Sequence, residues 1–240
     1  MIRIEHMEVC GMEHAIRGMR NPMNSWDKSD SRYGCHVDGE EACFCTTDEG
    51  ICNCVYWINE ECYIGSKQLI IGSNDLALMK QLANAGTDHR KFMRMIVVYC
   101  DITAPLYWWK EFDTYKVGTV ANSCSTMHKI HSKEFTLDDF SHEHLTDHDE
   151  KYSNTDLLWE VIKTMNAARE RFLESKDKSA WWQLIQLLPT SYNQKRTVML
   201  NYEVLVNIYH SRKNHKLDEW HIFCEWIVGL PYSELITGVG

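Results

Sequence analysis

The sequence has no long apolar run and no segment of biased composition. No stretch approaches about 18 uninterrupted apolar residues, the length that a membrane-spanning helix needs, so no membrane contact is expected. The first residues, MIRIEHMEVCGMEH, carry charges and lack the apolar core of a signal peptide. No internal repeat and no low-complexity linker divides the chain. These absences predict a cytoplasmic protein in which residues 1–240 form a single domain.

Positive charge is also scarce. The chain has 25 Lys and Arg against 34 Asp and Glu, which gives a net charge of −9. A general nucleic-acid-binding protein presents a basic face to the phosphates, so this balance argues against nucleic acid as a partner. Local basic pockets for a single phosphate are compatible with it.

Cysteine, in contrast, is abundant. Ten cysteines in a chain without a secretory signal indicate reduced thiols or metal ligands rather than a disulfide framework. In residues 41–57, two alternating runs flank the turn sequence at 48–50, which predicts a β-hairpin. Its pairing places four thiols on one face: Cys43, Cys45, Cys52 and Cys54. Four thiolates can bind zinc, but C-x-C is not the usual C-x-x-C spacing, so we favour a buried hairpin face over a metal site.

Histidine gathers in a second segment. Residues 128–152 carry five of the twelve histidines among many acidic residues: His128, His131, His142, His144 and His148. No H-x-x-x-H pair with a carboxylate at zinc spacing stands out, so we interpret the segment as a solvated acidic loop rather than a metal site.

Hydrophobic periodicity predicts helices and one buried strand. The helices are expected at residues 7–19, 73–85, 105–116, 155–174, 179–188 and 218–230. Ser73 is the expected N-cap of the second helix, and Pro105 the first residue of the third. The run FMRMIVVYCD at 92–101 predicts the strand, and the polar residues 24–39 predict a loop.

The stretch from Leu187 to Arg212 organises the rest of the chain. After Leu188-Pro189 and a polar run, apolar residues recur at helical spacing, which predicts a helix from Thr197 to Arg212. Asn201 and Arg212 would then lie on one side of it, about three turns apart. This amide and guanidinium can span a ligand with a ring at one end and a phosphate at the other. The alternative is an amphipathic core helix with polar flanks.

This stretch resembles the signature of the flavin-dependent thymidylate synthases. The residues that carry the resemblance appear in the family's order: Pro189, Tyr192, Asn201, Leu205 and Arg212. The order of elements agrees from about residue 70 to 230, whereas residues 25–62 look like an insertion that contains the Cys-rich hairpin. The resemblance implies an α+β fold in which helices flank a central sheet.

The chain departs from the family upstream of this stretch. Thr114-Tyr115-Lys116 stand where the family has Arg-His-Arg, and Lys110-Glu111 stand where it has Arg-Gln. The Ser that follows this motif falls on Cys124, or on Ser125 with one inserted residue. The resemblance therefore supports the fold more strongly than the reaction.

The resemblance also implies an activity. In the family, FAD accepts a hydride from NADPH, and methylene-tetrahydrofolate supplies a one-carbon unit to dUMP. Arg212 would polarise the pyrimidine ring, because a guanidinium against a carbonyl stabilises negative charge there. The expected FAD contacts are His89, Tyr115, Lys116 and Asn201. The expected nucleotide contacts are Lys110, Glu111, Ser123, Cys124 and Ser125.

The family is usually a homotetramer with sites shared between subunits, so the resemblance implies a homo-oligomer that binds a pyrimidine nucleotide. Two alternatives stay open. One is a non-catalytic nucleotide-binding protein on the same fold. The other is a zinc-stapled interaction protein built on the cysteine hairpin.

Overall fold

The computed structural model describes residues 1–34, 57–58, 61–62, 68–147 and 153–239. These residues form two compact units. The first comprises Met1–Val9 and Val97–Pro231, and the second comprises Cys10–Ile96 and Tyr232–Gly240. No helix in the described ranges is long and apolar enough to cross a membrane. The single-domain interpretation stays a prediction.

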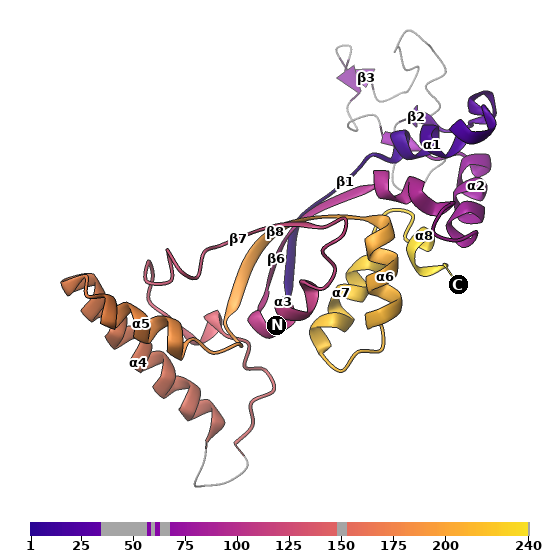
Figure 1. The fold of residues 1–240 in the computed structure, drawn as a ribbon. Coiled ribbons are helices and arrows are strands. Elements are labelled where there is room, and N and C mark those ends of the chain that lie inside the picture. Colours follow the sequence, from indigo (N-terminus) through magenta and orange to yellow (C-terminus); the bar gives the residue numbers. More distant parts are fainter. Residues whose placement is uncertain (35–56, 59–60, 63–67, 148–152, 240) are drawn as a thin grey trace. The chain divides into compact units, whose positions relative to one another are not determined.

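The first unit is built on a four-stranded sheet with the strand order β1-β6-β8-β7 (Figure 1). Its elements are β1 (Arg3–Cys10), β6 (Val97–Pro105), α3 (Leu106–Phe112), β7 (Val120–Ser123), η4 (Leu137–Asp139), α4 (Asn154–Ser175), α5 (Lys178–Leu187), β8 (Asn193–Asn201), α6 (Tyr202–Arg212) and α7 (Asp218–Val228). The mixture of helices and sheet confirms the α+β class.

The two faces of this sheet differ because side chains alternate along a strand. β6 and β8 pair antiparallel, with Thr103 opposite Lys195 and Ile102 opposite Arg196. In β6, Val98, Cys100, Ile102 and Ala104 are buried, whereas Tyr99 is 41% exposed. One face therefore packs into the core, and the other, which carries Thr103 and Lys195, is open.

Aromatic side chains of α3 and α7 form much of the core on the covered face. Trp108 packs against Trp220 at 4.8 Å between ring centroids and against Phe223 at 5.6 Å. Arg196 of β8 lies over the Trp109 ring at 4.2 Å and forms an ion pair with Asp113 at 2.7 Å. Figure 1 shows α3, α6 and α7 together on one side of the sheet.

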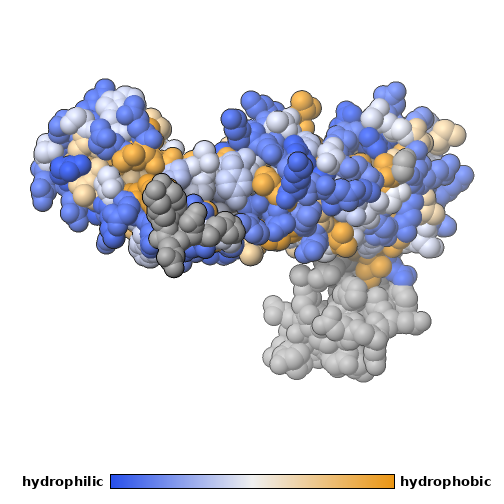
Figure 2. Space-filling model, turned by 90° about the horizontal axis from the view of Figure 1, so that it is seen from below, coloured by the Kyte–Doolittle hydropathy of each residue, from blue (hydrophilic) through white to orange (hydrophobic). Residues whose placement is uncertain are grey.

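Helices α4 and α5 pack against each other and against the loop before them. Their shared core contains Ile130, Phe135, Phe140, Leu158, Ile162, Met165, Ala168 and Leu184. Ser153 caps α4 by accepting a hydrogen bond from the Asp156 N–H, and Asp177 caps α5 through the Ser179 N–H. On the left of Figure 2, the side on which Figure 1 draws α4 and α5, hydrophobic residues are exposed between hydrophilic ones.

The second unit consists of short elements. They are α1 (Met12–Arg20), η1 (Asn21–Met23), η2 (Trp26–Lys28), β2 (Arg32–Gly34), β3 (Trp57–Ile58), β4 (Glu61–Cys62), β5 (Gln68–Ile70), α2 (Ser73–Asn84), η3 (Arg90–Met95) and α8 (Glu234–Thr237). β2 pairs antiparallel with β5, and β3 with β4.

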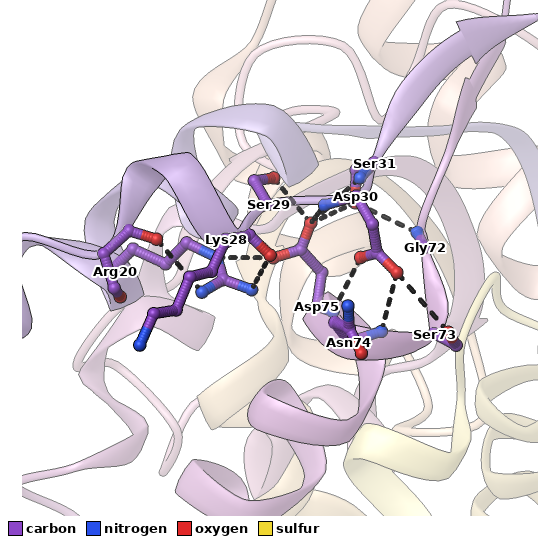
Figure 3. Close-up of polar contacts among 10 residues, drawn as sticks. Arg20, Lys28, Ser29, Asp30, Ser31, Gly72, Ser73, Asn74 and Asp75 are labelled. Carbon is purple, nitrogen blue, oxygen red and sulfur yellow. Dashed lines mark hydrogen bonds and ion pairs between the residues drawn. The ribbon is translucent and has the colours of Figure 1, made fainter.

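A buried carboxylate holds this unit together (Figure 3). Asp75 of α2 is fully buried and accepts a hydrogen bond from Arg20 Nε at 2.6 Å. The hydroxyls of Ser29 and Ser31 donate to its other oxygen, each at 2.6 Å. Asp30 accepts from the backbone N–H groups of residues 74 and 75, so it caps α2 from outside the helix. The loop at 29–31 is thereby fixed to the N-terminus of α2.

The predicted helix from Thr197 to Arg212 was wrong in its first part. Residues up to Asn201 belong to β8, and the helix α6 begins at Tyr202. Val198 and Leu200 are buried while Thr197 is exposed, which is the period of a strand. β8 pairs with both β6 and β7, and this pairing decides the strand.

Three other predicted boundaries need correction. The helix expected at 7–19 begins at Met12, because residues up to Cys10 form β1 and Gly11 has a φ of 88°. The strand expected at 92–101 is Val97–Pro105, preceded by the 3-10 helix η3. Ser73 is the first residue of α2 rather than its N-cap, which is Gly72.

The remaining helix predictions are confirmed within a few residues, as α2, α3, α4, α5 and α7. The expected loop at 24–39 contains η2 and β2 in its described part. The predicted cysteine hairpin, with Cys43, Cys45, Cys52 and Cys54, lies outside the described residues.

Candidate functional site

The C-terminal end of α6 places Arg212 in a cluster of polar and aromatic side chains. Arg212 Nη1 donates to Glu111 Oε2 at 2.8 Å, and its Nε donates to the Tyr115 hydroxyl at 2.8 Å. Its guanidinium lies 4.8 Å from the centroid of the Trp220 ring. The Arg212 side chain is 18% exposed, so it points neither into bulk water nor fully into the core.

This cluster fixes the orientation of the guanidinium. Glu111 also accepts a hydrogen bond from Trp220 Nε1 at 2.9 Å, and His215 Nε2 lies 3.4 Å from the same oxygen. The bonds to Glu111 and Tyr115 use two of the N–H donors of Arg212 and leave its others for a ligand oxygen. A fixed and partly desolvated guanidinium can stabilise negative charge that develops on a carbonyl.

Asn201 is the N-cap residue of α6, at the opposite end of this helix from Arg212. Its Oδ1 accepts from the Val204 N–H at 3.0 Å and so caps the helix, while its Nδ2 donates to the Gly118 carbonyl at 3.5 Å. Gly118 has a φ of 82°, and a Cβ there would lie 2.6 Å from Asn201 Nδ2. The predicted role of Asn201 as a flavin contact stays a prediction.

A cavity of about 390 Å³ lies beside the ends of β7 and β8. It is lined by two of the residues predicted to bind nucleotide, Cys124 and Ser125, both exposed. Its other lining residues are Arg3, Thr103, Thr126, Lys129, Ile130, Ser132, Lys133, Phe135, Asp138, Asp139, Tyr192, Asn193, Gln194 and Lys195. The segment after β7 is held there by hydrogen bonds to β8, from the Cys124 N–H to the Lys195 carbonyl and from Gln194 Nε2 to the Cys124 carbonyl.

The chemistry of this cavity suits an anion. Lys195 pairs with Asp101 at 2.9 Å and Lys133 pairs with Asp139, whereas Lys129 has no carboxylate partner among the described residues. The Thr103 hydroxyl is buried and has no hydrogen-bond partner in the described part of the chain. A phosphate can supply both an acceptor for this hydroxyl and a counter-charge for Lys129.

Tyr192 adds a hydroxyl donor to the same cavity. Burial raises the pKa of its phenol, and the negative charge of Asp139 raises it further. Its ring packs edge-on against Phe140 at 5.7 Å between centroids. The hydroxyl therefore stays protonated at neutral pH and can donate to an anion.

Arg212 lies on the covered face of the sheet, whereas Thr103 and Lys195 of the cavity lie on its open face. Arg196 reaches Trp109 and Asp113 on the covered face, where α3 also holds Arg212 through Glu111. Thr103 and Lys195 alternate with Arg196 along paired strands, so their side chains point to the open face. Within one chain, Thr103 and Lys195 therefore point away from Arg212, whereas Gln194, which also lines the cavity, lies on the covered face with Arg196.

The other predicted site residues are scattered. Lys110 is exposed on α3, Lys116 is exposed in the turn after it, and Ser123 is exposed at the end of β7. His89 is exposed in the second unit, immediately before η3. Among the described residues, no group of three or more His, Cys, Asp or Glu is placed to hold a metal ion.

Sequence reasoning missed several residues of this site. Thr103 and Lys129 were not predicted, although the basic residues close to Cys124 and Ser125 are visible in the sequence. The aromatic and acidic partners of Arg212 come from two separate segments: Glu111 and Tyr115 lie in and just after α3, and Trp220 lies in α7. The spacing of these residues in the sequence does not predict that their side chains meet.

Neither the models of protein families nor the curated proteins match this sequence. Solved structures do. Thymidylate synthase X from Helicobacter pylori with FAD and dUMP matches with a TM-score of 0.60 and 12% identity, covering 98% of this chain and 96% of that one. The UMP/dUMP methylase PolB from Streptomyces cacaoi, bound with 5-Br dUMP, matches with a TM-score of 0.56 and 14% identity, covering 100% and 96%. The chain therefore has the fold of the flavin-dependent thymidylate synthases. The resemblance implied this fold for about residues 70 to 230, and the structural match extends over 98% of the chain.

Proposed function

We propose that this protein modifies dUMP or a related pyrimidine nucleotide by transferring a one-carbon unit and a hydride to its ring. The observation that carries the proposal is the fold match over 98% of the chain to a thymidylate synthase solved with FAD and dUMP. A match to a UMP/dUMP methylase points to the same class of substrate. NADPH and methylene-tetrahydrofolate are the co-substrates in this proposal.

The cavity beside β8 would bind the nucleotide phosphate. Lys129 supplies a positive charge, and the hydroxyl of Thr103, buried without a partner in the described part of the chain, supplies a donor. The Ser125 hydroxyl and the protonated Tyr192 phenol lie in the same lining. Such charge-assisted hydrogen bonds hold a phosphate in one position and thereby orient the attached ring.

Arg212 would act on the ring itself. The aromatic face of Trp220 and the carboxylate of Glu111 hold its guanidinium in place before any substrate arrives. A donor that is already oriented does not have to reorganise when negative charge develops on a pyrimidine carbonyl, so it lowers the barrier to the reaction.

A complete site would combine two copies of the chain. The cavity residues Thr103 and Lys195 point to the open face of the sheet, away from Arg212. The edge strand β7 is exposed at all four positions, with Val120 60% exposed. We infer a homo-oligomer, with the tetramer expected, in which Arg212 of one copy meets the cavity of another.

The residues at 115–119 fit the phosphate end of a flavin. Lys116 is exposed and cationic, and the nearby Thr119 hydroxyl is buried with no partner among the described residues. Lys116 and Thr119 would hold the diphosphate of FAD, next to Tyr115. Bound FAD would supply the hydride for the reaction.

The absorption spectrum of the purified protein tests this proposal. We expect a flavin band, either at once or after titration with FAD, and oxidation of the reduced flavin that depends on dUMP. A protein that shows no flavin band after titration would contradict the flavin-dependent reaction. Sedimentation as a monomer would contradict the shared site.

One observation favours a second candidate, a non-catalytic nucleotide-binding protein. Tyr115 stands where the family has the central residue of its Arg-His-Arg motif, and its hydroxyl is used as an acceptor for Arg212. This candidate predicts a colourless protein whose melting temperature rises with dUMP. The zinc-stapled alternative depends on cysteines outside the described residues.

A further inference from the structure

A second cavity, of about 360 Å³, lies between the loop that follows β7 and the turn that joins α4 to α5. It is lined by Met127, His128, His131, Phe172, Lys176, Lys178 and Trp181. None of these residues lines the first cavity, whose wall is formed by their neighbours Ser125, Thr126 and Lys129. One segment thus separates two cavities.

The wall of this second cavity is aromatic. The His131 ring packs edge-on against Phe172 at 4.8 Å between centroids. Trp181 is half-buried and is fixed by a hydrogen bond from its Nε1 to the Met127 carbonyl at 3.2 Å. Rings held in this way can stack against a planar ligand without first being ordered, which lowers the entropic cost of binding.

The mouth of the cavity is basic. Lys176 lies over the face of Phe172, with its Nζ 5.8 Å from the ring centroid, and Lys178 begins α5 two residues later. The lining contains no Asp or Glu, in contrast to the first cavity, where Asp138 and Asp139 are present. The lysines of this lining therefore favour a negatively charged ligand.

A polar atom in the wall lacks a partner. His131 Nδ1 is buried and has no hydrogen-bond partner in the described part of the chain. A buried ring nitrogen without a partner costs free energy, and such a group often marks a place that a ligand or water fills. This observation is independent of the aromatic wall and of the two lysines.

We propose that this second cavity binds a nucleoside monophosphate, with the base stacked against Trp181 and Phe172 and the phosphate paired with Lys176 and Lys178. Every base presents an aromatic face to such a wall, and a lysine ammonium serves as a point charge for phosphate. The site is distinct from the one proposed for the reacting nucleotide and does not depend on that function.

Calorimetric titration of the full chain with AMP tests this proposal. We expect AMP to bind, and adenosine and inorganic phosphate to bind at least about tenfold more weakly, because each lacks one of the two contacts. Equal affinity for phosphate and AMP would contradict the proposed stacking of the base on Trp181 and Phe172. Absence of AMP binding would overturn the site as a whole.

Substitutions of the two lysines test whether AMP binds in this cavity. Lys176 has a φ of 57°, so Lys176→Gly removes the charge without backbone strain. Combined with Lys178→Ala, it should weaken AMP binding at least about tenfold. Lys163→Ala, on the exposed surface of α4, is the matched control and should have no effect.

Lys129→Ala distinguishes the two cavities. It should leave AMP binding unchanged and weaken dUMP binding if the first cavity holds the reacting nucleotide. Loss of AMP binding in Lys129→Ala, with no loss in the double variant, would overturn the proposal. Melting curves of all variants confirm that each is folded.

Discussion

Glu111 and Arg212 form an ion pair of 2.8 Å that joins α3 to the C-terminal end of α6. The pair is partly buried and lies against Trp220, whose Nε1 donates a second hydrogen bond to the same carboxylate. It connects segments separated by about a hundred residues in the sequence. The pair therefore orients the one guanidinium that the proposed reaction uses.

Removing the carboxylate should loosen this connection. Glu111→Ala leaves Arg212 and Trp220 Nε1 without their acceptor, and we expect the free energy of unfolding to fall by about 1–2 kcal/mol. Chemical denaturation measures this change. Glu111→Gln should restore part of it, and Glu170→Ala, at an exposed position on α4, should change nothing.

Replacing the guanidinium of Arg212 with an ammonium should lower the activity more than the stability. In Arg212→Lys the charge remains, but the oriented N–H donors against the pyrimidine are lost, so we expect turnover to fall by about 100-fold or more. Single-turnover kinetics with dUMP measure this loss. Arg171→Lys, the same substitution at an exposed position on α4, should keep full activity. Unchanged turnover in Arg212→Lys would remove Arg212 from the mechanism.

The turn at Gly118 should not accept a side chain. Its φ of 82° is costly for other residues, and a Cβ would come within 2.6 Å of Asn201 Nδ2, the residue that caps α6. We expect Gly118→Ala to lower the free energy of unfolding by more than about 1 kcal/mol. Gly86→Ala is the matched control, because Gly86 has a φ of 103° but no atom within 4 Å of its added Cβ. Equal losses in both variants would show that the contact with Asn201 carries no cost.

Asp75 should contribute stability that depends on pH. Burial opposes its ionisation, but hydrogen bonds from Ser29 and Ser31 and the Arg20 guanidinium outweigh burial and lower its pKa. Its stabilising effect is therefore fully present above the ordinary carboxyl pKa of about 4 and is lost as the pH falls through the lowered value.

Asp75→Asn tests this linkage. At neutral pH it leaves Arg20 buried without its charge partner, so we expect a loss of about 3 kcal/mol or more in unfolding free energy. The difference from the unsubstituted protein should shrink as the pH drops below about 4. Asp88→Asn, at an exposed position, controls for the loss of one charge. A difference that stays constant with pH would show that Asp75 is not the titrating group.

Thiol reactivity should separate buried from exposed cysteines. Burial raises the pKa of Cys100 to about 12 and that of Cys224 to about 11, so both stay protonated and inaccessible at pH 8 to 9. Cys10 and Cys124 are exposed. Peptide mapping after iodoacetamide treatment should show modification of the exposed pair alone among these four.

The same labelling reports on the nucleotide site. Cys124 lines the first cavity, so dUMP should slow its modification while leaving Cys10 unaffected. Equal rates at Cys124 with and without dUMP would place the nucleotide elsewhere.

Local patterns predicted the helices better than the strands. α4 and α7 show amphipathic periodicity strong enough to fix their type and their position within a few residues. The region around Thr197 has a pattern that suits both a helix and a strand, and pairing with β6 and β7 decided between them. Hydrogen bonds to distant segments leave no local signature.

For the candidate site, too, the sequence predicted the backbone positions of residues but not their side-chain contacts. The order of Pro189, Tyr192, Asn201 and Arg212 along the chain implied the fold, because a family's spacing of turn, strand and cap residues reflects its backbone geometry. That order does not report which side chains are already engaged. Asn201 caps a helix and Arg212 pairs with Glu111, and both facts depend on atoms brought together from elsewhere in the chain.

By itself, the sequence determined the α+β class, most of the helices and the segments that carry the candidate residues. The tertiary structure alone decided which of those residues share a cavity and which face of the sheet each occupies. The physical reason is that periodicity is a local property, set by neighbouring residues on one element. A cavity is formed by side chains from several elements, and its composition follows from strand register and helix packing.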